Sequence, residues 1–268
     1  MPHLTRRTAL AGLLATAVSP VLAAPASRLI EGPWRQFGPS GDPDHGAWAA
    51  LLARHLKMGS DGVARLSYAQ MPKTEVDGYV SSLAAVDPTT LTSNAAFAYW
   101  VNLYNALTVQ VVLGAYPVRS IRDIGGSLLA RGPWRRKVVT VAGRDLSLDD
   151  IEHGILRPVW RDPRIHYAVN CASIGCPNLA AEPYVSRRLD AMLTAAAQSY
   201  VNHPRGVSVT AEGLVLSSIY DWFISDFGGS DGGVLAHLAA HAAAPLRASI
   251  DTSPRIVGHR YDWGLNEA

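Results

Sequence analysis

The sequence predicts an α+β fold: a helix-rich single domain with a small, mainly antiparallel sheet around a buried central helix. Three observations favour this class. The segment 93–115 is apolar nearly all round and is stopped by Pro117, short β-type segments flank glycine-containing turns, and helices and strands do not alternate as in a repeated β-α-β chain. The 268 residues are enough for one sizeable core.

The N-terminus resembles a twin-arginine export signal. Arg6 and Arg7 precede a moderately apolar run, and residues 21–24 (VLAA) supply the small side chains expected at a cleavage site. The apolar run is too short to cross a bilayer. We expect residues 1–23 to be a signal peptide, residues 24–43 a partly ordered leader, and residues 44–268 the globular domain. The expected location is the periplasm or the outside of the cell.

Charge and hydropathy argue against two classes of partner. The formal net charge is +2, and the one basic block after the leader is Arg135-Arg136-Lys137, which is typical of a strand edge. Past the signal, no hydrophobic run is long and uniform enough for a further membrane segment. We therefore expect no nucleic acid and no integral membrane segment after signal removal, and we expect no cofactor. A small molecule, a peptide or a cell-envelope component is the expected substrate.

Helical periodicity dominates the first half of the domain. The first helix is expected to begin at Asp44 or His45 and to end at the GSDG turn of residues 59–62. A second helix covers 74–86, and the central helix covers 93–115. The apolar positions that define the first helix are Trp48, Leu51, Leu52 and Leu56.

The second half mixes short strands and helices. A hairpin is expected from 138–141 and Leu146, and Ser147 with Asp150 forms a capping box that opens a helix over 148–156. Residues 164–169, with β-branched and aromatic members, are expected to form a buried strand. The remaining elements are a helix over 186–201 capped by Ser186, a hairpin of 207–210 with 214–216, helices over 220–227 and 235–250, and a last strand over 255–257.

Two asparagines of the central helix share one face. Asn102 and Asn105 are three residues apart, with Tyr104 between them, in a segment that is otherwise apolar. A buried amide without partners costs about 1–3 kcal/mol, so both must be hydrogen-bonded. Either they brace neighbouring loops, or they line a pocket in which Asn105 orients a catalytic group and Asn102 and Tyr104 contact a substrate.

An acidic and histidine-containing helix is the second candidate segment. Glu152 and His153 follow Asp149 on the short capped helix. Asp149 and His153 are four residues apart and can meet, which would fix the imidazole tautomer or raise its pKa. The plain alternative is a solvated ion pair at a helix end.

The segment 165–177 (IHYAVNCASIGCP) holds both cysteines of the chain. On a strand, His166 and Asn170 would share a face, and Cys171 would follow at the strand end. Three interpretations remain open. Cys171 and Cys176 form a structural disulfide, or they bind a metal with the histidines, although the usual ligand spacing is missing, or Cys171 is a nucleophile activated by His166 or His153.

These segments together resemble the family catalogued as domain of unknown function 547. The similarity covers about residues 90–266 and brings no settled activity with it. The matching pieces are AFAYWVNLYNALTVQVVL (96–113), YPVRSIRDI (116–124), LSLDDIEHGILRP (146–158), DPRIHYAVNCASIGCPNL (162–179), LSSIYDWFISDF and YDWGLN.

The family's fold in turn resembles the papain and transglutaminase-like thiol enzymes, which place a nucleophilic cysteine on a central helix. This chain departs from that pattern, because Asn102 and Asn105 stand on the central helix and both cysteines follow His153. Either Cys171 reaches the same cleft from another segment, or the cleft binds a ligand without chemistry.

The first functional hypothesis is a thiol-dependent hydrolase or acyltransferase acting on an amide or ester. Cys171 is its nucleophile, His166 or His153 its base, and Glu152 or Asn105 orients the base. Amides of the turn from Asn170 to Ser173 hold the oxyanion, and the side chains of both residues contact substrate. The alternatives are a non-catalytic periplasmic binding or structural protein with a Cys171–Cys176 disulfide, and a metal-binding protein.

Overall fold

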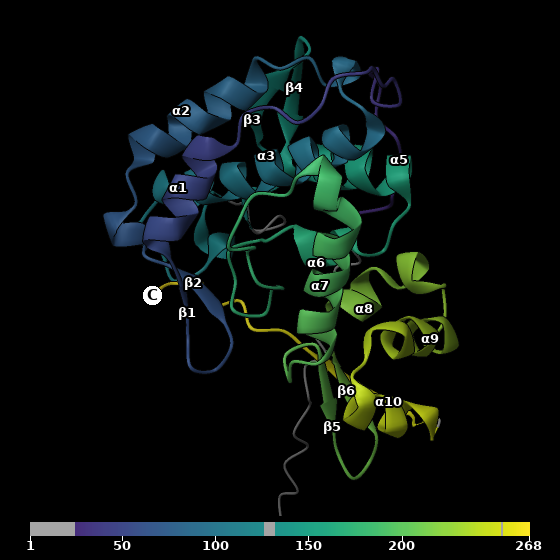
Figure 1. The fold of residues 1–268 in the computed structure, drawn as a ribbon. Helices are drawn as coiled ribbons and strands as arrows, with labels where there is room; N and C mark the ends of the chain where they lie inside the picture. The colour runs from purple at the N-terminus through teal and green to yellow at the C-terminus, as the bar shows by residue number, and fades with distance from the viewer. Residues whose placement is uncertain (1–24, 126–131, 253) are drawn as a thin grey trace, which may run out of the picture.

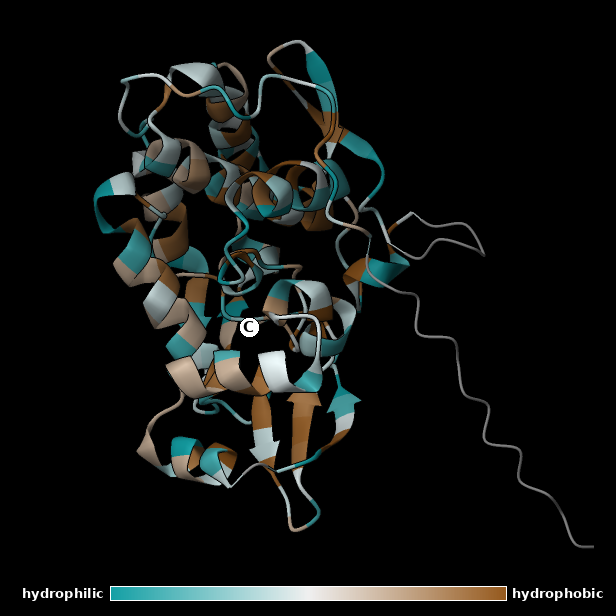
Figure 2. Cartoon of the chain, turned by 90° about the vertical axis from the view of Figure 1, so that its right-hand side faces the viewer, coloured by the Kyte–Doolittle hydropathy of each residue, from teal (hydrophilic) through white to brown (hydrophobic). Residues whose placement is uncertain are grey.

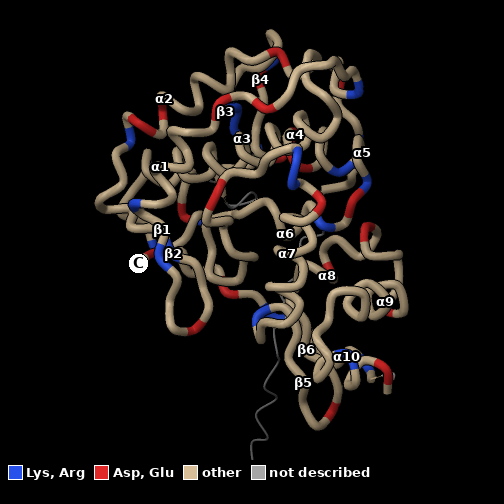
Figure 3. Tube along the Cα trace, viewed as in Figure 1, with Lys and Arg blue, Asp and Glu red and all other residues tan. Residues whose placement is uncertain are grey.

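The computed structural model describes residues 25–125, 132–252 and 254–268 (Figure 1). The predicted signal peptide lies outside these residues. The α+β class is confirmed, since helices surround three separate small sheets. Charged residues of both signs are interspersed along the traced chain (Figure 3).

The central helix is α3, Ser93–Leu113, and the prediction for it is confirmed. Thr92 caps it by accepting the Ala95 amide, and nearly all its side chains are buried. Helices α1, Gly46–His55, and α2, Lys73–Ala84, pack beside it. Among the described residues, α3 alone is long and apolar enough to cross a membrane, and 89% of its most apolar window is buried inside the protein.

The first predicted helix ends earlier than expected. Leu56 begins strand β1, Leu56–Met58, which pairs with β2, Ala64–Leu66, in an antiparallel hairpin. The GSDG segment is the turn of this hairpin, where Gly62 has a φ of 74° and Asp61 accepts the Val63 amide. The GSDG segment is therefore the turn of a hairpin and not the end of the helix.

A hairpin leads into the helical segment that carries the histidine. Strands β3, Lys137–Val141, and β4, Arg144–Ser147, confirm the predicted hairpin, and the capping box of Ser147 and Asp150 is present. The helix is not uniform. It consists of α4, Leu148–Ile151, a π-helical turn, Glu152–Leu156, and α5, Arg157–Trp160.

The predicted strand over 164–169 is wrong, because this segment forms helix α6, Ile165–Ala168. Asp162 accepts the Arg164 amide, and the carbonyls of Asp162 and Pro163 accept the next two amides. Asp-Pro thus starts a helical turn, which outweighs the β propensity of the side chains. All side chains of α6 are buried, so hydrophobicity alone does not distinguish this turn from a buried strand.

The last third of the chain forms a second core. Helix α7, Leu189–Val201, follows a 3₁₀ turn, Ser186–Arg188, in which Ser186 bonds to Asp42 and does not cap the helix. Strands β5, Val207–Val209, and β6, Leu214–Ser217, confirm the second hairpin. Strand β7, Ile256–Arg260, joins β6 in parallel. Hydrophobic residues mark this sheet (Figure 2).

The helices of this part are shorter than predicted. Residues 219–227 form α8, Ile219–Trp222, and a 3₁₀ turn, Ile224–Phe227. The expected helix 235–250 is two helices, α9, Asp231–His241, and α10, Ala244–Asp251. Asn202 bonds to the main chain of His241 and Ala243 at the break, and Pro245 starts α10. Further 3₁₀ turns are Tyr68–Gln70, Pro88–Thr90 and Ile121–Asp123.

The segment expected to be a leader packs on the domain from residue 25 onward. Trp34 is buried and makes an edge contact with Trp100 of α3, with ring centroids 5.4 Å apart. Further along, Ser40 bridges to Leu91. The main core thus includes a residue from the segment before α1.

Candidate functional site

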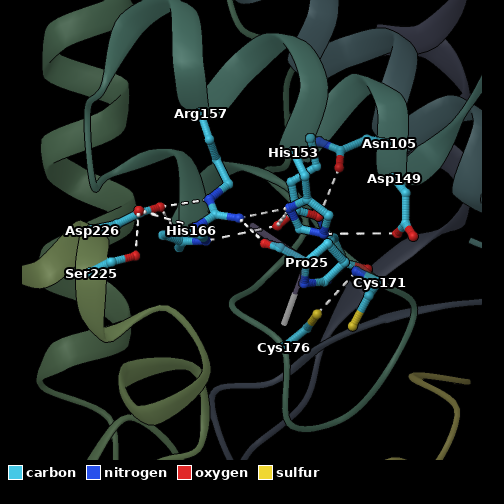
Figure 4. A network of polar contacts seen from close by, with 12 residues as sticks. Pro25, Asn105, Asp149, His153, Arg157, His166, Cys171, Cys176, Ser225 and Asp226 are labelled. Atoms are coloured by element: carbon cyan, nitrogen blue, oxygen red, sulfur yellow. Dashed lines mark hydrogen bonds and ion pairs between the residues drawn. The ribbon is translucent and has the colours of Figure 1, made fainter. Parts of the chain in front are cut away.

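Two buried histidines and two acids form one polar cluster between the π turn, α6 and the 3₁₀ turn at 224–227 (Figure 4). Glu152 Oε1 lies 3.8 Å from Nδ1 of His153 and 3.8 Å from Nδ1 of His166. His166 Nε2 is 2.8 Å from Asp226 Oδ2. Glu152, one of the two residues predicted to orient His166 or His153, thus lies near both imidazoles, and Asp226 contacts His166.

Arg157 connects this cluster. Its guanidinium donates to both carboxylate oxygens of Asp226, at 2.6 and 3.1 Å, and lies over the Phe223 ring. Nη1 donates to the Pro25 carbonyl at 2.8 Å and lies 3.1 Å from His153 Nδ1. His166 stacks on the same Phe223 ring, and the centroids of the two rings are 4.1 Å apart.

Burial is the main cause of the pKa shifts of three of the four titratable groups in this cluster. It lowers the pKa of His153 to about 4, even though Asp149, at 3.8 Å, acts in the opposite direction. The expected rise of this pKa is therefore wrong, because desolvation outweighs the ion pair. Burial also lowers the pKa of His166 and raises that of Glu152. For Asp226, hydrogen bonds from His166 and Arg157 outweigh burial and hold the pKa well below its usual value.

The asparagines brace the main chain around these clusters. Asn102 exchanges two hydrogen bonds with the main chain of Tyr184, and its amide nitrogen lies 3.2 Å from His45 Nε2. Asn105 donates to the Ala168 carbonyl and accepts the Asn170 amide. The bracing interpretation is confirmed for both, and Asn105 orients the segment leading to Cys171 rather than a histidine.

Asn170 and Tyr104 are also enclosed. Asn170 donates to the Pro177 carbonyl and accepts the Ala172 amide, which holds Ala172 at a left-handed φ of 58°. Tyr104 is buried beside Glu152, to which its phenol hydrogen-bonds. The two side chains expected to contact substrate are thus occupied by the protein itself.

The cysteines form a second cluster, and both are free thiols. Their side chains hydrogen-bond to each other, and the Tyr261 hydroxyl lies 3.1 Å from Cys171 Sγ and 3.2 Å from Cys176 Sγ. The Cys171 amide donates to Cys176 Sγ at 3.0 Å, and Ser173 Oγ is 3.1 Å from Cys171 Sγ. Cys171 is partly exposed, whereas Cys176 is 5% exposed.

The two thiols differ in acidity. Burial raises the pKa of Cys176, but the hydrogen bonds from Cys171, Tyr261 and the Cys171 amide outweigh it and lower the pKa to about 7. The hydrogen bond to Cys176 and burial raise the pKa of Cys171 well above its usual value. These hydrogen bonds therefore favour the thiolate on Cys176 over a thiolate on the predicted nucleophile Cys171.

The histidine and cysteine clusters are not joined. Within the described parts of the chain, neither sulfur has a histidine among its hydrogen-bond partners, although the sequence predicted a cysteine–histidine pair. The helical form of residues 165–168 removes the strand face that would have aligned His166 with the loop. The amides proposed for an oxyanion hole are already used at 170, 171 and 172.

Three residues of these clusters were missed in the sequence: Arg157, Asp226 and Tyr261. Asp226 bonds to His166 across 60 positions, and Tyr261 meets Cys171 across 90. Local periodicity carries no information on such pairs. The segments LSSIYDWFISDF and YDWGLN, which contain Asp226 and Tyr261, were noted only as matching pieces.

A search against family models matches residues 88–201 to the family described as "Protein of unknown function, DUF547". Residues 88–201 of the chain are therefore a domain of this family. The matched range of the DUF547 model contains α3, the π turn, both histidines and both cysteines, and it ends before Asp226 and Tyr261. No curated protein and no solved structure gives a significant match, so the resemblance to papain-like enzymes stays a prediction.

The positions of the cavities and of the metal-ligating side chains restrict the chemistry that this protein can carry out. In the described DUF547 chain, no three histidine, cysteine or acidic side chains converge as metal ligands. A cavity of about 210 Å³ is lined by Gly175, Arg205, Arg260, Asp262 and Tyr261, the residue whose hydroxyl contacts both sulfurs. A larger one, of about 500 Å³, lies between α1 and α2, away from every candidate residue.

Proposed function

We propose that Cys171 and Cys176 are a dithiol–disulfide pair that oxidises the thiols of a peptide or envelope-protein partner. The carrying observation is the asymmetry of the pair, in which Cys171 is the more exposed residue and the hydrogen bonds favour a thiolate on Cys176. Export by the predicted twin-arginine signal belongs to this proposal, because an oxidising compartment would regenerate the disulfide.

The reaction follows from this asymmetry. A partner thiolate attacks Cys171 Sγ of the disulfide form, the Cys171–Cys176 bond breaks, and its electron pair remains on Cys176 as a thiolate. A leaving thiol of low pKa departs faster. The second partner thiolate then attacks the partner's sulfur of the mixed disulfide and releases Cys171, which takes up a proton. The partner gains a disulfide, and the pair is reduced.

Hydrogen bonding favours oxidation of the partner over reduction. The Cys171 amide and Tyr261 donate to the Cys176 sulfur, and such bonds are strongest when it is a thiolate. They stabilise the reduced pair relative to the disulfide and so make the disulfide a stronger oxidant. Arg205 supports the same loop, since its guanidinium donates to the carbonyls of Ile174 and Cys176 at 2.7 Å.

Acyl transfer is supported less well by the same geometry. A cysteine hydrolase needs a base within hydrogen-bond reach of its nucleophile. The neighbours of Cys171 Sγ are a thiol, a serine hydroxyl and the Tyr261 phenol, whose pKa burial raises well above its usual value. None of these neighbours is an imidazole or a carboxylate, the groups that usually serve as the base in thiol hydrolases.

The test uses the oxidised full chain and a reduced two-cysteine peptide as the probe. We expect the wild-type chain to convert the peptide dithiol to a disulfide, measured by intact mass. For trapping, each reduced single variant is mixed with a one-cysteine peptide that is supplied as a mixed disulfide with a small thiol. Cys176→Ser is expected to displace the small thiol and accumulate the peptide as a mixed disulfide on Cys171, because no second sulfur then releases the peptide. Cys171→Ser is expected to trap at least about tenfold less peptide, because Cys176 is 5% exposed.

Equal trapping by the two single variants would show that the assigned asymmetry is wrong. An oxidised chain that leaves the peptide dithiol unchanged would instead favour a structural disulfide. Turnover of an ester probe that Cys171→Ser abolishes would favour acyl transfer. Ser173→Ala is a suitable control for loop integrity, because it keeps both sulfurs and removes only a neighbouring hydroxyl.

A further inference from the structure

Two carbonyl groups of the π-helical segment each lose one possible helix donor to a proline. Pro158 has no N–H, so it serves neither the Gly154 carbonyl four residues earlier nor the His153 carbonyl five residues earlier. The Arg157 amide donates to the Glu152 carbonyl, as a π turn requires. In this buried turn the two carbonyls can therefore accept hydrogen bonds from a neighbouring segment of the chain.

Residues 25–31, here called the arm, satisfy them. The Arg28 amide donates to the His153 carbonyl and the Ile30 amide to the Gly154 carbonyl, both at 3.1 Å. Because residues 28 and 30 alternate, the arm binds as an extended strand. The Pro25 carbonyl accepts from Arg157 at 2.8 Å (Figure 4). Three main-chain contacts thus hold the arm over the histidine cluster.

Leu29 and Ile30 of the arm pack against the main core, and of these two Ile30 fits a notch in the π turn. A Cβ at Gly154 would lie 2.7 Å from Ile30 Cγ2, so the missing side chain makes a notch for the isoleucine. Residues 26–28 are exposed, and the ion pair of Glu31 with Arg144 is exposed as well. The contact therefore selects an extended main chain and one aliphatic side chain, not a particular sequence.

The connection between the arm and the core allows the arm to detach from the π turn. Trp34 is buried against α3, and Gly32, with a φ of 151°, separates it from the arm. Beneath the arm lie the charged and titratable groups of the histidine cluster, next to the part of the main core on which Leu29 and Ile30 pack. Detachment would expose the groups best suited to polar contact with another chain.

We propose that the π turn is a binding site for an extended peptide, which the arm occupies in the same molecule. The ligand is a peptide strand that presents a carbonyl to Arg157 and, five residues later, an aliphatic side chain to the Gly154 notch. Main-chain pairing supplies affinity, and the notch supplies selectivity. This site is separate from the thiol pair and does not depend on its chemistry.

The test uses the full chain and a fluorescent peptide of sequence PASRLIEG, which corresponds to residues 25–32. Ile30→Asp is expected to release the arm, and trypsin is then expected to cut after Arg28 at least about tenfold faster than in the wild type. The peptide should bind Ile30→Asp at least about tenfold more tightly than the wild type, whose own arm competes at high effective concentration.

A second substitution tests the notch. Gly154→Ala in the Ile30→Asp background should abolish peptide binding, and a peptide with aspartate in place of the isoleucine should not bind Ile30→Asp. Circular dichroism shows whether each variant is folded. A folded Ile30→Asp chain that is not cut faster, or that is cut faster and fails to bind the peptide, would overturn the proposal. Equal binding of both peptides would overturn the assigned selectivity.

Discussion

Replacing Arg157 with methionine is expected to lower the free energy of unfolding by about 3 kcal/mol. The side chain of Arg157 is 3% exposed and forms two hydrogen bonds to Asp226. Methionine retains most of the apolar stem but leaves the Asp226 carboxylate with His166 as its remaining strong partner. Breaking a buried pair costs more than the pair contributes, because a desolvated charge remains.

Urea unfolding of the purified variants measures this effect. Arg144→Met is the matched control, since it removes an exposed ion pair with Glu31 and is expected to cost under about 1 kcal/mol. A cost for Arg157→Met no larger than that for Arg144→Met would contradict the central structural place given to this guanidinium. His166→Gln should also destabilise the protein, because it removes the other group bonded to Asp226.

A second large effect is expected from pH. The folded pKa of His153 is about 4, below the ordinary value of 6.5, so the unfolded chain binds this proton more readily than the folded one. Stability from the neutral histidine is complete above pH 6.5 and is lost as pH falls toward 4. The lost free energy is about 3 kcal/mol, from the size of the shift.

The comparison of wild type with His153→Gln isolates this contribution. Glutamine lacks the titrating group, so its free energy of unfolding should fall less steeply between pH 6.5 and 4. His237, whose pKa burial also lowers to about 4, remains in both proteins and contributes to both slopes. Identical slopes would mean that His153 is not held neutral by burial.

Local signals in the sequence predicted the elements that depend on neighbouring residues. The apolar segment before Pro117 indicated α3, and Ser147 with Asp150 indicated the start of α4. The segment 164–169 was mistaken for a strand because a fully buried helical turn and a buried strand have the same apolar composition. The Asp-Pro pair before it was the available signal.

The chemistry of the site was predictable only in part. Cys171, His166 and Glu152 were identified by residue type, but their grouping into two clusters depends on Asp226 and Tyr261, which are distant in sequence. For Asn105 the sequence left two interpretations open, a bracing role and a catalytic one. Its hydrogen bonds to the Ala168 carbonyl and the Asn170 amide favour the bracing role. The π turn depends on Pro158 and on the arm, so helical periodicity did not reveal it.

The most direct measurement of the proposed thiol chemistry is the titration of the reduced pair. Thiolate absorbance near 240 nm, taken as the difference between reduced and oxidised full chain, should rise with a midpoint at about pH 7. Cys176→Ser should remove this transition, and Tyr261→Phe should move the midpoint upward, because the thiolate loses a donor. Absence of any thiolate below about pH 8.5, the ordinary cysteine value, would contradict Cys176 as the leaving group.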